Sequence, residues 1–330
     1  MQNLAEPLVL GPVSIPNRVL LAPMSGVSDR PFRALAAEFG AGLVVSEMVA
    51  SDQLAAGHAE ATMRAERAGA GLHVIQLAGR EAHWMAEGAR AATEAGADII
   101  DINMGCPARK VTSGYSGSAL MRDLDHALTL IEATVGATPV PVTLKMRLGW
   151  DDRSINAPEL ARRAENAGVR MITVHGRTRC QFYAGRADWA AIRAVKQAVS
   201  IPVIANGDAT GLDDIAPMLS ASGADGIMIG RGAYGRPWLP GRIAHHAATG
   251  ILPEPPPLAE VATRHYEALL EQYGAFLGAR VARKHLGWYM EQAPADDPML
   301  RRAVLTAARP SEVRHHLAAW FAAGLERRAA

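Results

Sequence analysis

The sequence has only two cysteines among its 330 residues. Two cysteines cannot form a disulfide framework, and reduced thiols in the cytoplasm are the expected state. The N-terminal stretch MQNLAEPLVLGPVSIPNR lacks the basic start and the long apolar core of a signal peptide. No apolar run approaches the roughly 18 residues that a membrane span requires. We therefore expect a cytoplasmic protein without membrane contact.

A charge excess of one sign is also missing, because 34 Lys and Arg balance 33 Asp and Glu to a formal net charge of +1. A nucleic-acid partner cannot be argued from that total, so any basic surface must be local. No pair of closely spaced His or Cys indicates a metal site, and no Walker loop or G-x-S-x-G elbow occurs. We expect no metal.

Eight short apolar runs recur at intervals that leave room for a helix between them. Ala-rich stretches with helical spacing separate the runs, and several of these stretches close on Gly, as helix C-termini often do. Such alternation indicates a parallel sheet covered by helices, and eight units in about 240 residues predict a (β/α)₈ TIM barrel rather than a doubly wound sheet. The eight runs are 19–24, 42–48, 72–78, 98–104, 141–147, 171–177, 202–207 and 226–231.

The alternating pattern stops near residue 245, and we predict a barrel domain over 1–248. The following stretch TGILPEPPPLAE holds four prolines and predicts a stiff linker over 249–258. Beyond it, apolar residues at three- and four-residue spacing predict a small all-α bundle over 259–330.

The last segment contains a basic cluster followed by two aromatic residues. Arg280, Arg283 and Lys284 precede Trp288 and Tyr289. A solvated helix face is the more common meaning of such a cluster, and a nucleic-acid contact is the alternative.

Polar or reactive residues follow seven of the eight expected strands. In a TIM barrel the C-terminal strand ends form the active site, so these side chains should converge. They are Pro23-Met24-Ser25-Gly26, Gln76, Asn103 with Cys106, Lys145 with Arg147, His175 with Arg177, Asn206-Gly207-Asp208 and Gly230-Arg231.

Lys145 and Arg147 lie two residues apart and should share one face of their strand. A lysine in mid-strand is expensive to bury unless it meets an anion or an electron-rich ring. The alternative is a structural salt bridge inside the barrel.

The stretch GRGAYG at 230–235 matches G-x-G-x-x-G, but no acidic residue on a second strand supports a dinucleotide fold. As the loop after an eighth barrel strand, its Gly amides can hold one phosphate. Together with NGD at 206–208, this loop indicates a mononucleotide cofactor. A lysine beside the ring of that cofactor, Lys145, points to FMN.

Cys106 lies in a Gly-Cys-Pro turn, where a buried core cysteine has little reason to be. Its ordinary pKa of about 8.5 leaves the thiol protonated at neutral pH, which suits a general acid better than a nucleophile. The Gly- and Ser-rich stretch that follows could form a mobile lid. Cys180 has no comparable setting and is expected to be incidental.

These residues carry a family resemblance. The stretches APMSGVSDRPFR, VSEM, DINMGCPARKV with GSALM, VTLKMRLGW, VHGRTR, IPVIANGD, ADGIMIGRGAYGRPW and RVARKHLGWY resemble the tRNA-dihydrouridine synthases, and most of all the bacterial B-type enzymes. The resemblance covers nearly the whole chain. It implies an FMN-containing barrel with a helical tRNA-binding domain, which reduces the C5–C6 bond of a D-loop uridine while NADPH recharges the flavin.

The resemblance also implies roles for individual residues. Cys106 resembles the proton donor to C5, after hydride has reached C6. Lys145 resembles the lysine at the pyrimidine edge of the flavin. Asn103 resembles a residue beside the target uracil, which Arg177 is also expected to reach. The flavin-ring contacts would be Pro23, Met24, Ser25 and Gln76, and the ribityl and phosphate contacts His175, Asn206, Gly207, Asp208, Gly230 and Arg231.

A tRNA partner requires recognition mainly of shape and phosphate. The expected RNA contacts are Arg109 and Lys110 near the barrel mouth and Arg280, Arg283 and Lys284 in the helical segment. We expect a monomer. Two rival functions are a small-molecule flavin oxidoreductase of the dihydroorotate dehydrogenase kind and a regulatory RNA-binding flavoprotein.

Overall fold

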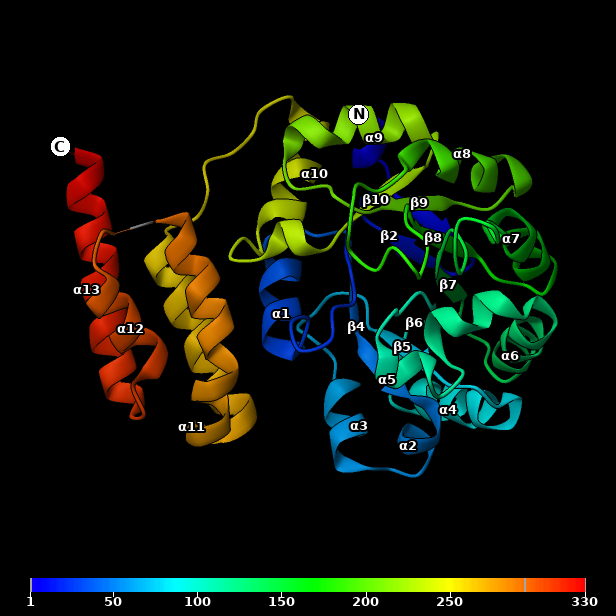
Figure 1. Cartoon of the computed structure of the whole chain (residues 1–330), viewed down its shortest axis with the longest axis horizontal. Helices are drawn as coiled ribbons and strands as arrows, with labels where there is room; N and C mark the ends of the chain where they lie inside the picture. The colour runs from blue at the N-terminus through cyan, green and yellow to red at the C-terminus, as the bar shows by residue number, and fades with distance from the viewer. Residues whose placement is uncertain (1, 294, 330) are drawn as a thin grey trace.

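The computed structural model describes residues 2–293 and 295–329. Residues 1, 294 and 330 belong to the expected domain ranges but lie outside the residues that the structure describes. Eight parallel strands close into a barrel in the order β10-β3-β4-β5-β6-β7-β8-β9 (Figure 1). Each strand coincides with one of the eight apolar runs, so the predicted TIM barrel is confirmed. The strands are β3 (Val19–Leu21), β4 (Leu43–Ala50), β5 (Val74–Ala78), β6 (Ile99–Met104), β7 (Val142–Arg147), β8 (Met171–His175), β9 (Val203–Asn206) and β10 (Gly226–Ile229).

The strand register places the polar residues in rows. Asn103 on β6 pairs with Lys145 on β7. Arg147 at the end of β7 pairs with His175 on β8, which pairs with Asn206 on β9. Because parallel neighbours in register present their side chains at the same height, the C-terminal end of the barrel becomes a ring of polar groups.

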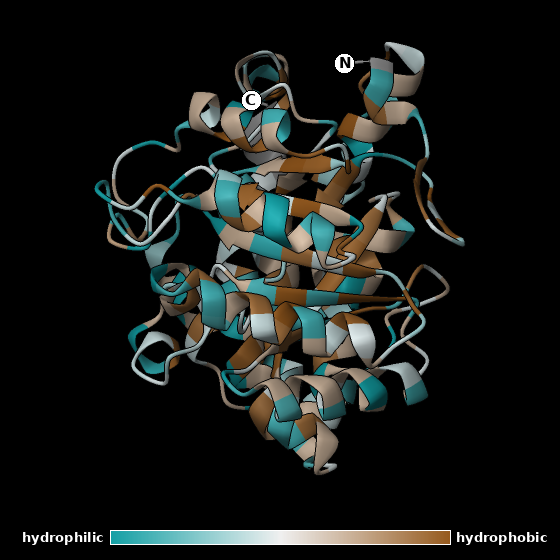
Figure 2. Ribbon diagram, turned by 90° about the vertical axis from the view of Figure 1, so that its right-hand side faces the viewer, coloured by the Kyte–Doolittle hydropathy of each residue, from teal (hydrophilic) through white to brown (hydrophobic). Residues whose placement is uncertain are grey.

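Helices cover the outside of the barrel, whose strands are largely hydrophobic (Figure 2). Alanine faces such as Ala89 and Ala92 on α4 and Ala161 and Ala164 on α7 are fully buried, because a small side chain allows a helix to approach the sheet closely. The helices are α1 (Arg30–Glu38), α2 (Ser51–Ala55), α3 (Ala59–Arg64), α4 (Ala82–Glu94), α5 (Arg109–Thr112), α6 (Leu124–Gly136), α7 (Ala157–Asn166), α8 (Trp189–Ala198), α9 (Ile215–Ser222) and α10 (Leu239–Thr249), with 3₁₀ turns η1 (Gln2–Ala5), η2 (Gly117–Arg122), η3 (Leu212–Asp214) and η4 (Arg231–Ala233).

An N-terminal hairpin, which the periodicity did not indicate, is formed by β1 (Leu8–Leu10) and β2 (Val13–Ile15). Leu8, Leu10 and Ile15 pack against the first residues of the barrel strands. The hairpin therefore closes the N-terminal end of the barrel and leaves the polar end open.

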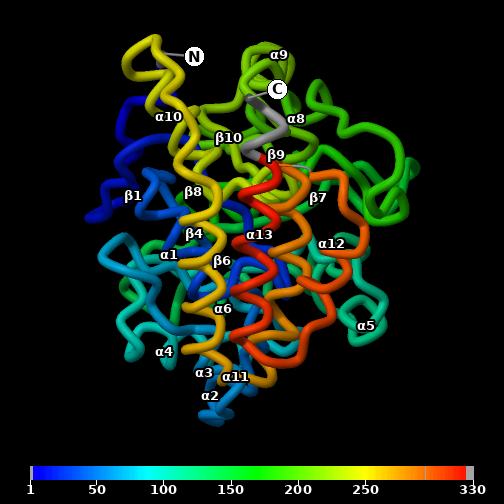
Figure 3. Tube along the Cα trace, turned by 90° about the vertical axis from the view of Figure 1, so that its left-hand side faces the viewer, coloured from blue at the N-terminus to red at the C-terminus, as the bar shows by residue number. Residues whose placement is uncertain are grey.

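Three further helices form a bundle on one side of the barrel (Figure 3). They are α11 (Leu258–Gln292), α12 (Pro298–Thr306) and α13 (Pro310–Ala329). Their apolar core also takes in Leu35 of α1 and Trp238 before α10, so the bundle packs on the barrel. Gly274, at φ 74° and ψ 164°, breaks α11 into two helical parts.

The segment between α10 and α11 has no regular secondary structure, as its prolines require. None of the described helices is both long and apolar enough to cross a membrane.

Candidate active site

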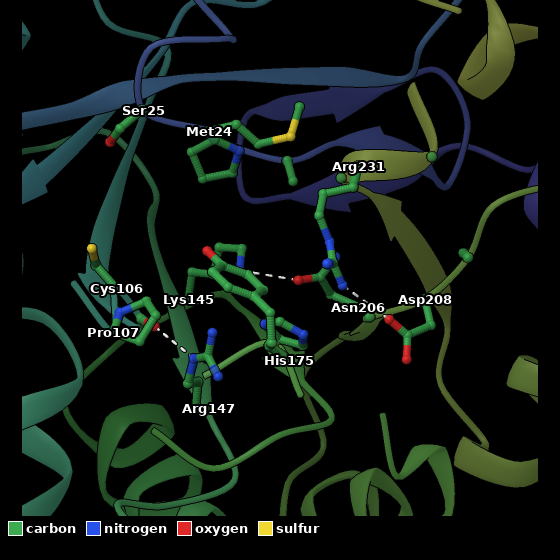
Figure 4. Close-up of a pocket in the computed structure, with 18 of the residues that line it drawn as sticks. Met24, Ser25, Cys106, Pro107, Lys145, Arg147, His175, Asn206, Asp208 and Arg231 are labelled. Carbon is green, nitrogen blue, oxygen red and sulfur yellow. Dashed lines mark hydrogen bonds and ion pairs between the residues drawn. The ribbon is translucent and has the colours of Figure 1, made fainter. Parts of the chain in front are cut away.

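A cavity of about 660 Å³ opens at the C-terminal ends of the barrel strands. The labelled residues extend from Cys106 and Pro107 on one side, past Lys145 and His175, to Asp208 and Arg231 on the other (Figure 4). The structure thus brings together thirteen residues that the sequence placed in one site. They are Pro23, Met24, Ser25, Gln76, Asn103, Cys106, Lys145, His175, Asn206, Gly207, Asp208, Gly230 and Arg231.

The turn that carries Cys106 is held by its backbone. The amides of Gly105 and Cys106 donate to Asn103 Oδ1 at 3.1 and 3.0 Å. The Cys106 carbonyl accepts from Ser118, from the amide at 3.1 Å and from Oγ at 2.8 Å. Gly117 is required at φ 60°, because a Cβ there would lie 2.9 Å from the Cys106 oxygen. The cysteine loop, residues 105–122, therefore folds back onto its own start.

Burial raises the pKa of the Cys106 thiol, while the Ala108 amide and the nearby Arg147 and Lys145 act in the opposite direction. The thiol is therefore protonated at neutral pH. The same amide and cations would stabilise the thiolate that remains after a proton has been given away.

A chain of side-chain hydrogen bonds fixes Asn103. Its Nδ2 donates to Gln76 Oε1 at 2.7 Å, and Gln76 Nε2 donates to Asp101 Oδ2 at 2.7 Å. Thr143 Oγ1 donates to the other oxygen of Asp101 at 2.6 Å. All four side chains are buried. Because each donor in this chain has an acceptor, the Asn103 side-chain oxygen is the end of its amide that faces the Cys106 turn.

Lys145 lies in the middle of the cavity wall, where Nζ donates to Asn206 Oδ1 at 3.1 Å. Burial, and secondarily the charge of Arg147, lowers the pKa of Lys145 to about 8. Its ammonium is therefore charged at neutral pH and incompletely compensated.

Arg147 is a site residue whose role the sequence did not show. It is 1% exposed, and its guanidinium donates to the carbonyls of Gly105 at 2.9 Å, Thr178 at 2.8 Å and Phe182 at 2.7 Å. Arg147 thus joins the cysteine loop to the loop after β8. Within the described residues neither Lys145 nor Arg147 forms an ion pair, so the salt-bridge alternative is not what the structure shows.

Asp208 and Arg231 form the other end of the cavity and are paired at 3.2 Å. Burial alone would raise the pKa of Asp208, but hydrogen bonds from Arg177 and the Ala187 amide outweigh burial and lower it. His175 stays neutral, because burial and the surrounding cations, Lys145 first, hold its pKa well below the ordinary value.

The expectation that Arg177 reaches the substrate needs correction. Arg177 does not line the cavity, is 1% exposed and binds both oxygens of Asp208 at 2.9 and 2.7 Å. It also donates to the Ala184 and Gly185 carbonyls. Its donors are committed to its neighbours, so it positions Asp208 from behind the cavity wall.

Tyr183 is a second cavity residue that the sequence reasoning missed. Its ring lies under the guanidinium groups of Arg147 and Arg231, at 5.4 and 4.9 Å. Its place in the stretch HGRTRCQFY, just after a strand end, was the available signal. Met48, Tyr234 and Arg236 also line the cavity.

The residues expected to contact RNA lie outside this cavity. Arg109 and Lys110 are exposed on α5, and Arg280 and Arg283 are exposed on α11. Lys284 is half-buried, and its Nζ lies 3.5 Å from the position that a Cβ on Gly26 would take. Lys284 is therefore a contact between α11 and the loop after β3.

Cys180 is exposed on the loop after β8, and no disulfide joins it to Cys106. Among residues 2–293 and 295–329, no group of three or more His, Cys, Asp or Glu is placed to hold a metal ion.

Comparison with known proteins shows to which family the chain is similar. The sequence profile of the family described as Dihydrouridine synthase matches residues 20–323. A probable tRNA-dihydrouridine synthase of Rhizobium leguminosarum is 59% identical over 91% of this chain and 94% of that protein. The tRNA-dihydrouridine synthase B of Xanthomonas campestris is 48% identical over 92% of each chain.

Solved structures show the same fold at low identity. The chain matches histamine dehydrogenase from Rhizobium sp. 4-9 with a TM-score of 0.56 and 18% identity, over 75% of this chain and 49% of the other. It matches morphinone reductase in complex with tetrahydroNAD with a TM-score of 0.52 and 18% identity, over 77% and 93%. These likenesses establish the barrel fold alone.

Proposed function

The chain belongs to the dihydrouridine synthase family, and we propose that it reduces a uridine of the tRNA D-loop to 5,6-dihydrouridine, with FMN as resident cofactor and NADPH as reductant. The observation that carries the proposal is the placement of a protonated thiol, Cys106, on the same cavity as the ammonium of Lys145. Reduction of the uracil C5–C6 bond requires a hydride at C6 and a proton at C5.

The cavity residues fit a flavin mononucleotide. The volume of the cavity lies within the usual range for cofactor sites. The Lys145 ammonium, charged and short of partners, would face the electron-rich edge of the ring. Asp208 offers carboxylate oxygens to ribityl hydroxyls, and Arg231 with the Gly230 backbone would hold the phosphate. When bound, FMN would supply the hydride that adds to C6.

Close backbone packing at Gly207 also shapes the cavity beside His175. A Cβ on Gly207, which has φ 119°, would lie 2.7 Å from Ala187 and 2.9 Å from the His175 ring. Glycine therefore allows the backbone to approach His175, and the neutral imidazole is left as a hydrogen-bonding group.

Cys106 acts as the general acid in this proposal. Its raised pKa keeps the proton available at neutral pH. The proton passes from Sγ to C5, and the C5–C6 double bond becomes a single bond. Arg147, Lys145 and the Ala108 amide stabilise the resulting thiolate.

The helical segment 259–330 would bind tRNA, with Arg280 and Arg283 on the exposed side of α11 meeting phosphates. A uridine inside folded RNA must be extruded to enter a cavity at a barrel mouth. Part of the recognition energy is therefore used to open the RNA.

Purified protein should be yellow, and with NADPH it should form dihydrouridine in unmodified tRNA. Free uridine and orotate serve as alternative substrates in the same assay. Reduction of either free pyrimidine at a rate comparable to tRNA would favour the small-molecule oxidoreductase instead. A colourless protein that binds no flavin would refute the proposal.

A further inference from the structure

Two loops at the mouth of the cavity carry cations and no acids. The cysteine loop, residues 105–122, has Arg109, Lys110 and Arg122, and the loop after β8, residues 176–187, has Arg177, Arg179 and Arg186. Arg177 is committed to Asp208, and within the described residues none of the other five forms an ion pair. In a chain of net charge +1 this is a strong local excess.

The two loops are joined into one surface at Trp150, on the loop after β7. The guanidinium groups of Arg122 and Arg179 lie 4.9 and 4.7 Å from the centre of the Trp150 ring. Arg179 Nη2 also donates to Thr112 Oγ1 of the cysteine loop at 3.2 Å. The β7 loop adds Asp151 and Asp152 with Arg153, so the combined surface remains cationic. We call residues 105–122, Trp150 and residues 176–187 the mouth surface.

Exposed aromatic residues lie on both loops in an unfavourable backbone conformation. Among the described residues only three that are not glycine have positive φ, namely Tyr115 at 56°, Phe182 at 54° and Asp208 at 56°. Tyr115 is 68% exposed and Phe182 is 43% exposed. A left-handed conformation is costly for bulky side chains, and strained residues of this kind cluster at functional sites.

Packing within the protein does not account for these two rings. The Phe182 ring meets Tyr183 edge-on at 5.0 Å, and its carbonyl is held by Arg147, but nearly half of the residue is left open to solvent. Tyr115 follows Gly114 in the middle of the cysteine loop and is more exposed still. Aromatic rings interleaved with unpaired cations are suited to a polyanion whose own rings can stack on them.

We propose that the mouth surface binds the RNA strand on either side of the extruded uridine, with Tyr115 and Phe182 stacking on its unpaired bases. The inference rests on the proposed function and adds to it a second RNA contact, separate from α11. Arg109, Lys110, Arg179 and Arg186 meet phosphates, while the two rings replace the base stacking that extrusion removes.

The test measures the affinity of flavin-loaded protein for unmodified tRNA at several salt concentrations. The variants are Tyr115→Asn and Phe182→Asn, because Asn tolerates positive φ and should not disturb folding. Val9→Thr is the matched control, since Val9 is 66% exposed on the hairpin at the opposite end of the barrel. Lys110→Ala reports on phosphate contacts.

Each aromatic variant should bind tRNA about tenfold more weakly with an unchanged salt dependence. Lys110→Ala should reduce the slope of log affinity against log salt by about 0.7 to 0.9. Val9→Thr should bind like the wild type, and Tyr115→Asn should keep its melting temperature and its tRNA-independent NADPH oxidation.

Wild-type affinity in both aromatic variants would overturn this inference and leave the proposed function standing, and so would an altered salt slope in either of them. Failure of the wild-type protein itself to bind tRNA would overturn the proposed function first.

Discussion

The side-chain oxygen of Asn103 accepts a hydrogen bond from the backbone amide of Cys106 at 3.0 Å. Asn103, the last residue but one of strand β6, thereby fixes the turn that presents the thiol. Because Asn103 is itself oriented by Gln76 and Asp101, the position of Cys106 depends on a chain of buried polar side chains.

Replacing Asn103 by Ala should therefore displace the thiol without removing it. The amides of Gly105 and Cys106 and the Gln76 oxygen would lose their partner, and each unsatisfied buried group costs about 1–3 kcal/mol. We expect uridine reduction to fall by at least about tenfold. In a Cys180→Ser background, the rate of Cys106 alkylation should also change.

Asn17→Ala is the matched control, because Asn17 Nδ2 donates a hydrogen bond to the Gly40 carbonyl at 3.0 Å near the other end of the barrel. It should lower stability and leave alkylation of Cys106 as in the wild type. An Asn103→Ala protein with wild-type alkylation and turnover would show that the amide does not position the thiol.

The buried ammonium of Lys145 should make the stability of the protein depend on pH, with a sign that can be checked. Burial lowers its pKa from 10.5 to about 8 in the folded protein. Between these two pKa values the unfolded chain binds one more proton than the folded protein, so the contribution of Lys145 to the free energy of unfolding rises with pH. Below pH 8 both states carry the charge, and the cost of burying it is fully present. The melting-temperature advantage of cofactor-free Lys145→Met over the wild type should therefore shrink between pH 7 and 10.

The same Lys145→Met variant should lose flavin function, because no charge would face the reduced ring. Flavin reduction by NADPH, followed by absorbance, is the measurement. A melting difference that does not vary with pH, together with wild-type flavin reduction, would contradict the assignment.

Charge reversal on α11 should separate two roles that the sequence grouped together. Arg283→Glu, on the exposed face, should weaken tRNA binding several-fold and spare tRNA-independent NADPH oxidation. Lys284→Glu should impair both, because its ammonium lies against Gly26, next to the cavity residues Met24 and Ser25.

Binding titrations and NADPH oxidation measured on the same two preparations check this prediction. Identical effects of the two substitutions would mean that Lys284 is only another surface cation.

The barrel was predictable because its strands are continuous apolar runs that end in polar residues. The same rule gathered Asn103, Lys145, His175 and Asn206, since neighbouring parallel strands end at the same height. Arg147 and Arg177 show the limit of that rule. Arg147 ends β7 and Arg177 lies just beyond β8, as site residues do. However, Arg147 joins two loops and Arg177 supports Asp208, and only tertiary packing distinguishes such roles.

The N-terminal hairpin was missed for a similar reason. Leu8, Leu10 and Ile15 give too short a pattern to identify strands, and their meaning comes from the barrel end that they cover. Lys284 was grouped with Arg283 because sequence spacing does not tell which side of a helix meets another part of the fold.

The central claim is that Cys106 supplies the proton that completes uridine reduction. It is tested most directly by measuring dihydrouridine in tRNA from a strain lacking this enzyme, supplied with the wild-type chain or with Cys106→Ala. The wild type should restore dihydrouridine, whereas Cys106→Ala, purified yellow and still oxidising NADPH, should form it at least about a hundredfold more slowly. Equal restoration by both chains would contradict the account.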